Sequence, residues 1–87
     1  MAGYSLFFKD SARKDLDSIP GNDLRRIMER IGNLAANPRP IGCEKLSGQE
    51  KYRLRQGNYR IIYSIQDTQL TVWMVKVGHR REVYRTS

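Results

Sequence analysis

The sequence predicts an α+β fold of two layers, in which an N-terminal strand and a helical hairpin pack on an antiparallel β-meander. Three observations support this prediction. Apolar residues recur at helical spacing in the first half of the chain, between residues 10 and 36. Alternating polar and apolar residues, rich in tyrosine, isoleucine and valine, follow between residues 50 and 77. Turn sequences divide this second half into short segments. The length of 87 residues fits a single domain, residues 1–87, with one core.

The chain begins with an expected strand and a first helix. Residues 4–8, with the sequence YSLFF, are aromatic and apolar as a strand requires. Asp10 or Ser11 is the expected cap of the helix that follows, and Pro20 with Gly21 ends it. The apolar face of this helix consists of Ala12, Leu16 and Ile19.

A second helix is expected from the N-cap Asn22 to Asn37, where Pro38 disfavours further α conformation. Its apolar face consists of Leu24, Ile27, Met28, Ile31, Leu34 and Ala35. The opposite face carries Arg25, Arg26, Glu29, Arg30 and Asn33, and we interpret it as solvated surface. Both helices are therefore expected to cover one face of the sheet with their apolar sides.

The stretch from residue 50 to residue 65, EKYRLRQGNYRIIYSI, predicts a β-hairpin with Gly57 and Asn58 as a two-residue loop. This loop pairs Arg55 with Arg60, and it pairs residues 53 and 51 with residues 62 and 64. Directly opposed residues project from the same face of a sheet. One face therefore gathers the basic residues Lys51, Arg53, Arg55 and Arg60. The other face, which the helices cover, gathers Tyr52, Leu54, Tyr59, Ile61, Tyr63 and Ile65.

The remaining segments complete the predicted meander. Residues 38–48 form a linker that is rich in Pro, Gly and Ser, and Asp67 with Thr68 offers a second two-residue turn. Residues 69–77 form the last strand, which Gly78 ends. The same pairing argument places Leu70, Val72 and Met74 on the helix-covered face and Thr71, Trp73, Val75 and Val77 on the basic face. We interpret Trp73 as a packing residue at the sheet edge rather than the floor of a groove.

The basic face needs an explanation, because clustered like charges repel and Arg55 opposite Arg60 is unfavourable. One explanation is a solvated rim of basic residues that prevents edge-to-edge aggregation. The other is a surface for a polyanion such as a phosphate backbone. The composition favours an anionic partner, since 16 Lys and Arg residues against 9 Asp and Glu residues give a net charge of +7.

Composition also excludes several classes of protein. The longest apolar run, residues 70–77, is interrupted by Thr71 and Lys76 and is too short to span a membrane. No cleavable signal is visible at the start of the chain. The sole cysteine, Cys43, cannot form an intrachain disulfide, so a reducing, cytoplasmic location is the simplest expectation. Cys43 and the sole histidine, His79, give no zinc-binding spacing, and no metal or other cofactor is expected.

Three motifs in order, KLSG at residues 45–48, YRLRQGNYRIIYSI at 52–65 and GHRREVYR at 78–85, resemble the RelE family of bacterial and archaeal toxins, in the RelE/ParE superfamily. The resemblance covers nearly the whole chain. It implies a microbial-ribonuclease-like fold and cleavage of messenger RNA in the ribosomal A site. It also implies an antitoxin partner that is RelB-like, encoded beside the toxin, and acidic or amphipathic. The catalytic residues that it implies are Lys51, Arg53, Arg60, Arg80 and Tyr84, and the further RNA-binding residues are Lys45, Arg55 and Arg81.

The chemistry implied by this resemblance assigns a role to each group. Attack of a ribose 2′-hydroxyl on the adjacent phosphate needs a base, stabilisation of the phosphorane charge and an acid for the leaving oxygen. Arg55 and Arg60 suit the phosphorane, Arg80 suits the leaving group, and Tyr84 can stack on a base. Relatives carry a lysine at the position that matches Arg53, and arginine effectively never deprotonates. Lys51 is therefore the better candidate base, and we interpret His79 as a bystander.

Two other functions compete with a ribosome-dependent nuclease. ParE-like relatives share the fold, lack the nuclease residues and inhibit DNA gyrase. A basic RNA-binding module without catalysis is the third possibility. The presence of Arg60, Arg80 and Tyr84 together favours the nuclease.

Overall fold

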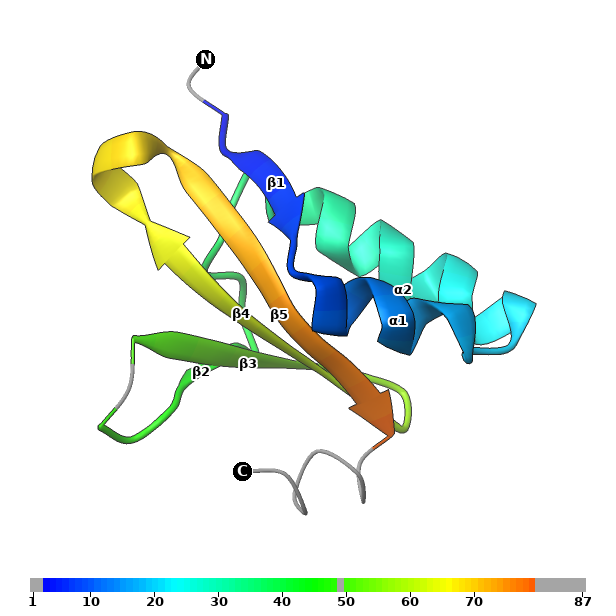
Figure 1. Ribbon diagram of the computed structural model, residues 1–87. Coiled ribbons are helices and arrows are strands. Elements are labelled where there is room, and N and C mark those ends of the chain that lie inside the picture. The colour runs from blue at the N-terminus through cyan, green and yellow to red at the C-terminus, as the bar shows by residue number, and fades with distance from the viewer. Residues whose placement is uncertain (1–2, 49, 80–87) are drawn as a thin grey trace.

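The computed structural model describes residues 3–48 and 50–79. The elements within these ranges are β1 (Ser5–Phe8), α1 (Asp10–Asp17), α2 (Gly21–Asn33), β2 (Glu44–Lys45), β3 (Lys51–Gln56), β4 (Tyr59–Gln66), a 3₁₀ turn (Asp67–Gln69) and β5 (Thr71–His79). Figure 1 shows α1 and α2 on the same side of the sheet. The predicted two-layer α+β fold is confirmed. None of the helices in these ranges is long and apolar enough to cross a membrane.

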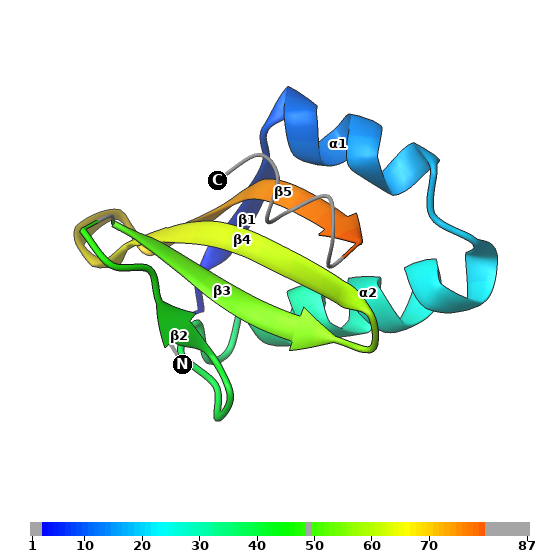
Figure 2. The same ribbon diagram turned by 90° about the horizontal axis from the view of Figure 1, so that it is seen from below.

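The described strands form one five-stranded sheet in the order β1-β5-β4-β3-β2. Strands β2 to β5 pair antiparallel, which contains the predicted meander, and β1 pairs parallel with β5. Figure 2 shows β3, β4 and β5 side by side at the centre of the sheet. We did not predict β2, which lies within the expected linker and has only two residues. This strand has no apolar pattern of its own, and it exists because it pairs with β3.

The β3–β4 hairpin has the predicted register. Arg55 pairs with Arg60, Arg53 with Ile62, and Lys51 with Ser64. Gly57 has a φ of 59°, a left-handed conformation that glycine adopts without a steric penalty. A two-residue loop fixes which residues oppose one another, and this explains why the prediction is correct along the whole hairpin.

The predicted turn between β4 and β5 is wrong. The connection is the 3₁₀ turn Asp67–Gln69 followed by Leu70, which has a φ of 51°. The longer connection moves the pairing by two residues, so that Ile65 opposes Val72 instead of Leu70. Leu70 therefore lies outside the strand and is 39% exposed, although we expected it on the helix-covered face of the last strand.

A β-bulge in β5 also changes the predicted faces. Tyr63 opposes Met74, whereas the preceding residue of β4, Ile62, opposes Lys76, so Val75 is an extra residue. Beyond the bulge the alternation is shifted by one position. Val77 consequently lies in the core with an exposure of 1%, although we expected it on the basic face. The strand also continues past Gly78 to His79.

The helix starts differ from the predicted caps. α1 begins at Asp10, with Lys9 at the cap position, and α2 begins at Gly21, with Pro20 at the cap position. Neither cap residue makes a side-chain hydrogen bond. Met28 is 40% exposed and lies at the border of the apolar face of α2. The core that both helices cover consists of Ala12, Ile19, Ile27, Ile31, Leu34, Leu54, Ile61, Tyr63, Val72, Met74 and Val77.

Helix α1 protects the edge of β5 where β1 has ended. β1 pairs with β5 only as far as Met74, which would leave the following edge groups of β5 without a neighbouring strand. Ser11 Oγ donates to the carbonyl oxygen of Val75 at 2.6 Å, and Asp15 Oδ2 accepts the backbone N–H of Val77 at 3.0 Å. Two side chains of α1 thus replace strand pairing over the last part of the edge.

Candidate nucleic-acid interface

The face of the sheet opposite the helices, which we call the open face, carries the basic residues of the hairpin. Cross-strand pairing arranges its residues in three rows that run across the sheet. The first row is Phe7, Trp73, Ser64 and Lys51. The second row is Lys76, Ile62, Arg53 and Glu44. The third row is Gly78, Arg60 and Arg55.

The open face therefore brings together four of the predicted site residues, Lys51, Arg53, Arg55 and Arg60. Lys51 and Arg53 are half-buried and Arg55 is exposed. Such a concentration of positive charge on one surface is the arrangement that phosphate groups recognise. Four cations on neighbouring strands also make this face unfavourable for packing against other basic surfaces.

Arg60 differs from its neighbours because it is buried, with an exposure of 2%. We expected it on an open surface. Within the described ranges it is the only buried charged residue. The residue opposite it on β5 is Gly78, which has no side chain, and a guanidinium keeps its charge when it is buried. Arg60 thus provides a fixed positive charge within the third row, in surroundings of lower dielectric than water.

Glu44 lies on the open face, although the sequence did not indicate it as a site residue. Its Oε2 atom lies 3.3 Å from Nη2 of Arg53, directly across the β2–β3 pair. Among the strand residues that form the three rows, Glu44 is the only carboxylate. It holds the Arg53 guanidinium in place, and it can accept a proton, which arginine cannot. Glu44 could have been identified as a site residue only from its pairing with Arg53, and this pairing could not be predicted without β2.

Lys45 does not join the other predicted residues. It pairs with Tyr52, so it projects to the side of the sheet opposite Arg53 and Glu44. Its Nζ atom lies 4.0 Å from Oε2 of Glu50, and both side chains are exposed. This position at the sheet border is suited to peripheral contact with an anion, and it is separate from the three rows.

The predicted residues Arg80, Arg81 and Tyr84 lie outside the described residues. The last described residue, His79, pairs with Tyr59, and the two rings make an edge contact at 5.7 Å. Because Tyr59 packs against the core, the His79 ring lies on the helix side of the sheet, away from Arg60. This placement agrees with the interpretation of His79 as a bystander.

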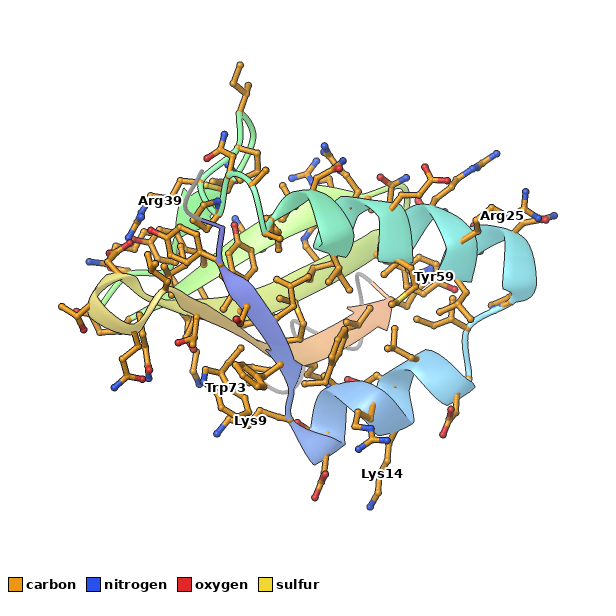
Figure 3. All side chains as sticks on the ribbon, turned by 90° about the horizontal axis from the view of Figure 1, so that it is seen from above. Lys9, Lys14, Arg25, Arg39, Tyr59 and Trp73 are labelled. Carbon is orange, nitrogen blue, oxygen red and sulfur yellow. The ribbon has the colours of Figure 1, made fainter. Side chains whose placement is uncertain are left out.

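A second polar cluster, formed by Tyr4, Arg39, Tyr52 and Asp67, lies at the other end of the sheet. Arg39 binds Asp67 with both terminal nitrogens, at 2.9 and 3.1 Å, and Tyr4 donates to Asp67 Oδ1 at 2.8 Å. These hydrogen bonds, the one from Arg39 first, lower the pKa of Asp67. Figure 3 shows Arg39 at the opposite end of the molecule from Tyr59. The charges of this cluster neutralise each other, so we assign it to stabilising the β4–β5 turn.

Arg39 also connects the turn to the core. Its Nε atom donates to the Tyr52 hydroxyl at 3.2 Å, and the Tyr52 ring stacks on Tyr63 with the centroids 5.9 Å apart. Tyr63 donates to the carbonyl oxygen of Pro38 at 2.8 Å, and its burial is the main cause of its raised pKa. No group of three or more His, Cys, Asp or Glu residues with metal-binding geometry occurs in the described part of the chain.

A two-layer α+β domain with a basic sheet face has the charge arrangement that suits nucleic acid or another polyanion. Comparison with known proteins gives the family. The chain belongs to the RelE/ParE superfamily of toxins: the family model described as ParE toxin of type II toxin-antitoxin system, parDE, matches residues 6–84. The resemblance that the three motifs indicated is thereby confirmed.

Individual relatives extend over nearly the whole chain. The chain is 34% identical to Toxin RelG of Mycobacterium tuberculosis, over 94% of its own length and 97% of the relative. It is 29% identical to the mRNA interferase toxin RelE of Escherichia coli, over 93% of its length and 90% of the relative.

Solved structures of this family have the same fold. The toxin-antitoxin complex RelBE2 of Mycobacterium tuberculosis matches with a TM-score of 0.80 and 31% identity, over 90% of this chain and 99% of that one. The archaeal RelE-RelB complex of Pyrococcus horikoshii matches with a TM-score of 0.80 and 30% identity, over 92% of this chain and 97% of that one.

Proposed function

We propose that this protein is the toxin of a type II toxin-antitoxin pair and that it arrests translation by cleaving messenger RNA in the ribosomal A site. The observation that carries the proposal is the open face, where Lys51, Arg53, Arg55 and Arg60 lie on two paired strands. Similarity to a relative named mRNA interferase supports cleavage rather than inhibition of gyrase.

The proposed reaction is attack of a ribose 2′-oxygen on the adjacent phosphorus. The bond from phosphorus to the 5′-oxygen of the next nucleotide breaks, which leaves a cyclic phosphate and a 5′-hydroxyl. No metal is needed for this step, because the RNA supplies its own nucleophile. Arg53, Arg55 and Arg60 stabilise the charge that develops on the phosphorane oxygens: Arg53 and Arg55 can bind phosphate oxygens in pairs, and the buried Arg60 contributes its positive charge. Arg80 and Tyr84 keep the proposed roles of acid for the leaving oxygen and stacking ring.

The open face offers two candidates for the base that takes the 2′-proton. Lys51 is the candidate from the sequence, and it lies in the row next to Arg53. Glu44 is the candidate from the structure, because its carboxylate is 3.3 Å from the Arg53 guanidinium. In either case the ribosome contributes by holding the 2′-oxygen in line with the phosphorus. Such orientation lowers the activation free energy of the reaction by a large amount.

We infer that the antitoxin is a RelB-like protein with an acidic or amphipathic segment that binds this basic domain in the cytoplasm. Both solved structures described above are complexes of a RelE-type toxin with its antitoxin. A flexible acidic segment can cover a large basic surface and neutralise it.

Primer-extension mapping of messenger RNA ends after brief expression tests the proposed function. We expect breaks at codon-phased positions in translated messages and little cutting of naked RNA at the same toxin concentration. Arg53→Ala and Arg55→Ala should reduce cleavage strongly, whereas Arg25→Ala and Arg26→Ala, exposed on α2, should not affect the chemical step. DNA breaks with intact messenger RNA would instead place the protein among gyrase inhibitors, and efficient cutting of naked RNA would refute the dependence on ribosomes.

A further inference from the structure

The first row of the open face ends in an aromatic pair that the proposed reaction does not use. Phe7 and Trp73 oppose each other in the β1–β5 pair, and their rings stack with centroids 4.8 Å apart and an interplanar angle of 25°. Lys9 Nζ lies 4.8 Å from the centroid of the Trp73 ring. Figure 3 shows the Lys9 and Trp73 side chains next to each other beside β1.

This aromatic pair is not part of the core. The neighbours of Trp73 on β5, Val72 and Met74, are buried, whereas Trp73 is half-buried and Phe7 is 42% exposed. Both rings project from the open face, because alternate residues of a strand point to opposite sides. An exposed pair of aromatic rings on a sheet is a surface on which planar groups can stack.

The aromatic pair is continuous with the basic residues. Phe7, Trp73, Ser64 and Lys51 follow one another across four neighbouring strands. At a strand separation of about 4.8 Å, this row is about 14 Å long. This length exceeds the spacing of successive phosphates along one strand of a nucleic acid, which is about 3.4 Å along the axis of duplex DNA, so the row can contact more than one nucleotide. One strand can therefore contact the arginines with its phosphates and the aromatic pair with one of its bases.

We propose that Phe7 and Trp73 form a stacking subsite for a nucleobase of a single-stranded RNA, and that Lys9 binds the phosphate of the stacked nucleotide. Sheet surfaces with exposed aromatic residues bind single-stranded RNA in this way in other folds. The charges of the open face and of Lys9 fit a phosphate backbone. The inference rests on the proposed function, since it identifies a further contact for the RNA that is cleaved.

Trp73 provides a direct signal for occupancy because it is the only tryptophan of the chain. Binding of a short single-stranded oligoadenylate to the purified toxin is followed by tryptophan fluorescence and, separately, by the anisotropy of a label on the RNA. An abasic oligonucleotide of the same length has the same phosphates but no bases. We expect oligoadenylate to quench Trp73 and the abasic strand to bind without quenching.

Variants separate stacking from packing. Phe7→Leu keeps an apolar side chain of similar size but lacks an aromatic face, so it should weaken oligoadenylate binding about 5- to 100-fold and leave abasic binding unchanged. Trp73→Phe keeps a ring and should bind oligoadenylate nearly as wild type does in the anisotropy assay. Met28→Ala is the control, because Met28 is 40% exposed but lies on α2. The melting temperature of each variant confirms that the fold is retained.

Oligoadenylate that fails to bind, or that binds without quenching Trp73, would overturn the inference, as would an equal loss of abasic binding in Phe7→Leu. Quenching by a purified antitoxin but not by RNA would assign the aromatic pair to a protein partner and would also overturn it. Failure of the subsite and failure of the proposed function can be distinguished. A toxin that binds as expected but leaves translated messages intact keeps the subsite and refutes the nuclease. If the wild-type toxin cleaves messages and the Phe7→Leu variant binds RNA as tightly as the wild type, only the subsite is refuted.

Discussion

Replacing Glu44 with glutamine is expected to strengthen RNA binding by the open face and to steepen its dependence on salt. The Glu44 carboxylate is 3.3 Å from the Arg53 guanidinium, so part of the positive charge of this row is neutralised within the protein. Glutamine keeps the size of the side chain and one acceptor oxygen. The variant therefore presents one more net positive charge to a phosphate backbone.

The structure sets the magnitude of both effects. The Arg53 side chain is 22% exposed and that of Glu44 is 60% exposed, so the pair is largely solvated and its loss should cost about 0–1 kcal/mol of folding free energy. One further neutralised phosphate changes the slope of log K against log salt concentration by about −0.7 for a single strand. The slope for Glu44→Gln should be more negative than that of the wild type by this amount.

Fluorescence anisotropy of a labelled RNA strand, measured between about 50 and 200 mM salt, gives the slope. Glu50→Gln is the matched control, because it removes the same charge from a residue whose side chain is 91% exposed and lies 4.0 Å from Lys45 instead of Arg53. Equal slopes for the two variants would refute the argument that Glu44 neutralises the RNA-binding arginine.

Single-turnover cleavage on programmed ribosomes by the same variant identifies the base. If Glu44 takes the 2′-proton, Glu44→Gln should cleave about 10²- to 10⁴-fold more slowly in spite of tighter binding. If Lys51 is the base, Lys51→Met should show that loss and Glu44→Gln should retain cleavage.

Three further predictions concern the buried Arg60, the edge of β5 and the stability of the fold at low pH. Arg60→Ala should slow single-turnover cleavage about 10²- to 10³-fold and weaken ribosome binding much less. Arg60→Lys keeps the charge and should slow cleavage less. A proportional loss of binding and cleavage would make Arg60 a docking residue. Asp15→Ala leaves the Val77 N–H without its acceptor and should lower the unfolding free energy by about 1–3 kcal/mol in a denaturant titration. Asp15→Asn retains an acceptor oxygen and should lower it less. Equal losses of unfolding free energy would contradict the protection of the β5 edge by Asp15. Hydrogen bonds from Arg39 and Tyr4 lower the pKa of Asp67 below its ordinary value of 3.8, so the stability that Asp67 contributes is present above that value and is lost as the pH falls through the lower folded pKa. Thermal melts at decreasing pH should therefore show a smaller acid-dependent loss for Asp67→Asn than for the wild type.

Local patterns were sufficient to predict much of the fold. The β3–β4 register followed from a two-residue loop that contains a glycine, and the helix-covered faces of β3 and β4 followed from that register. The β4–β5 connection could not be predicted in the same way. Its left-handed residue is Leu70, which gives no signal for such a turn, and the bulge at Val75 is a property of the paired strands rather than of either sequence.

The candidate site was predicted only in part, and for related reasons. Lys51, Arg53 and Arg55 share a face because alternation within one strand requires it. The burial of Arg60 has no signal in the alternation of β4, and the Glu44–Arg53 ion pair depends on a two-residue strand. Lys45 is one residue from Glu44, yet it projects to the other side of the sheet. Contacts between segments distant in the sequence decided each of these cases.

The pairing of Arg55 with Arg60 links the stability of this domain to the ions around it. Two cations directly opposite each other disfavour the folded state, and an anion that binds beside Arg55, the exposed member of the pair, favours folding by mass action. The free domain at low salt concentration should thus be less stable than the domain bound to an anion. Either a polyanionic ligand or an acidic partner should raise its melting temperature. Degradation in the cell acts on unfolded molecules, so the lifetime of the free domain should depend on how much of it is bound at any moment.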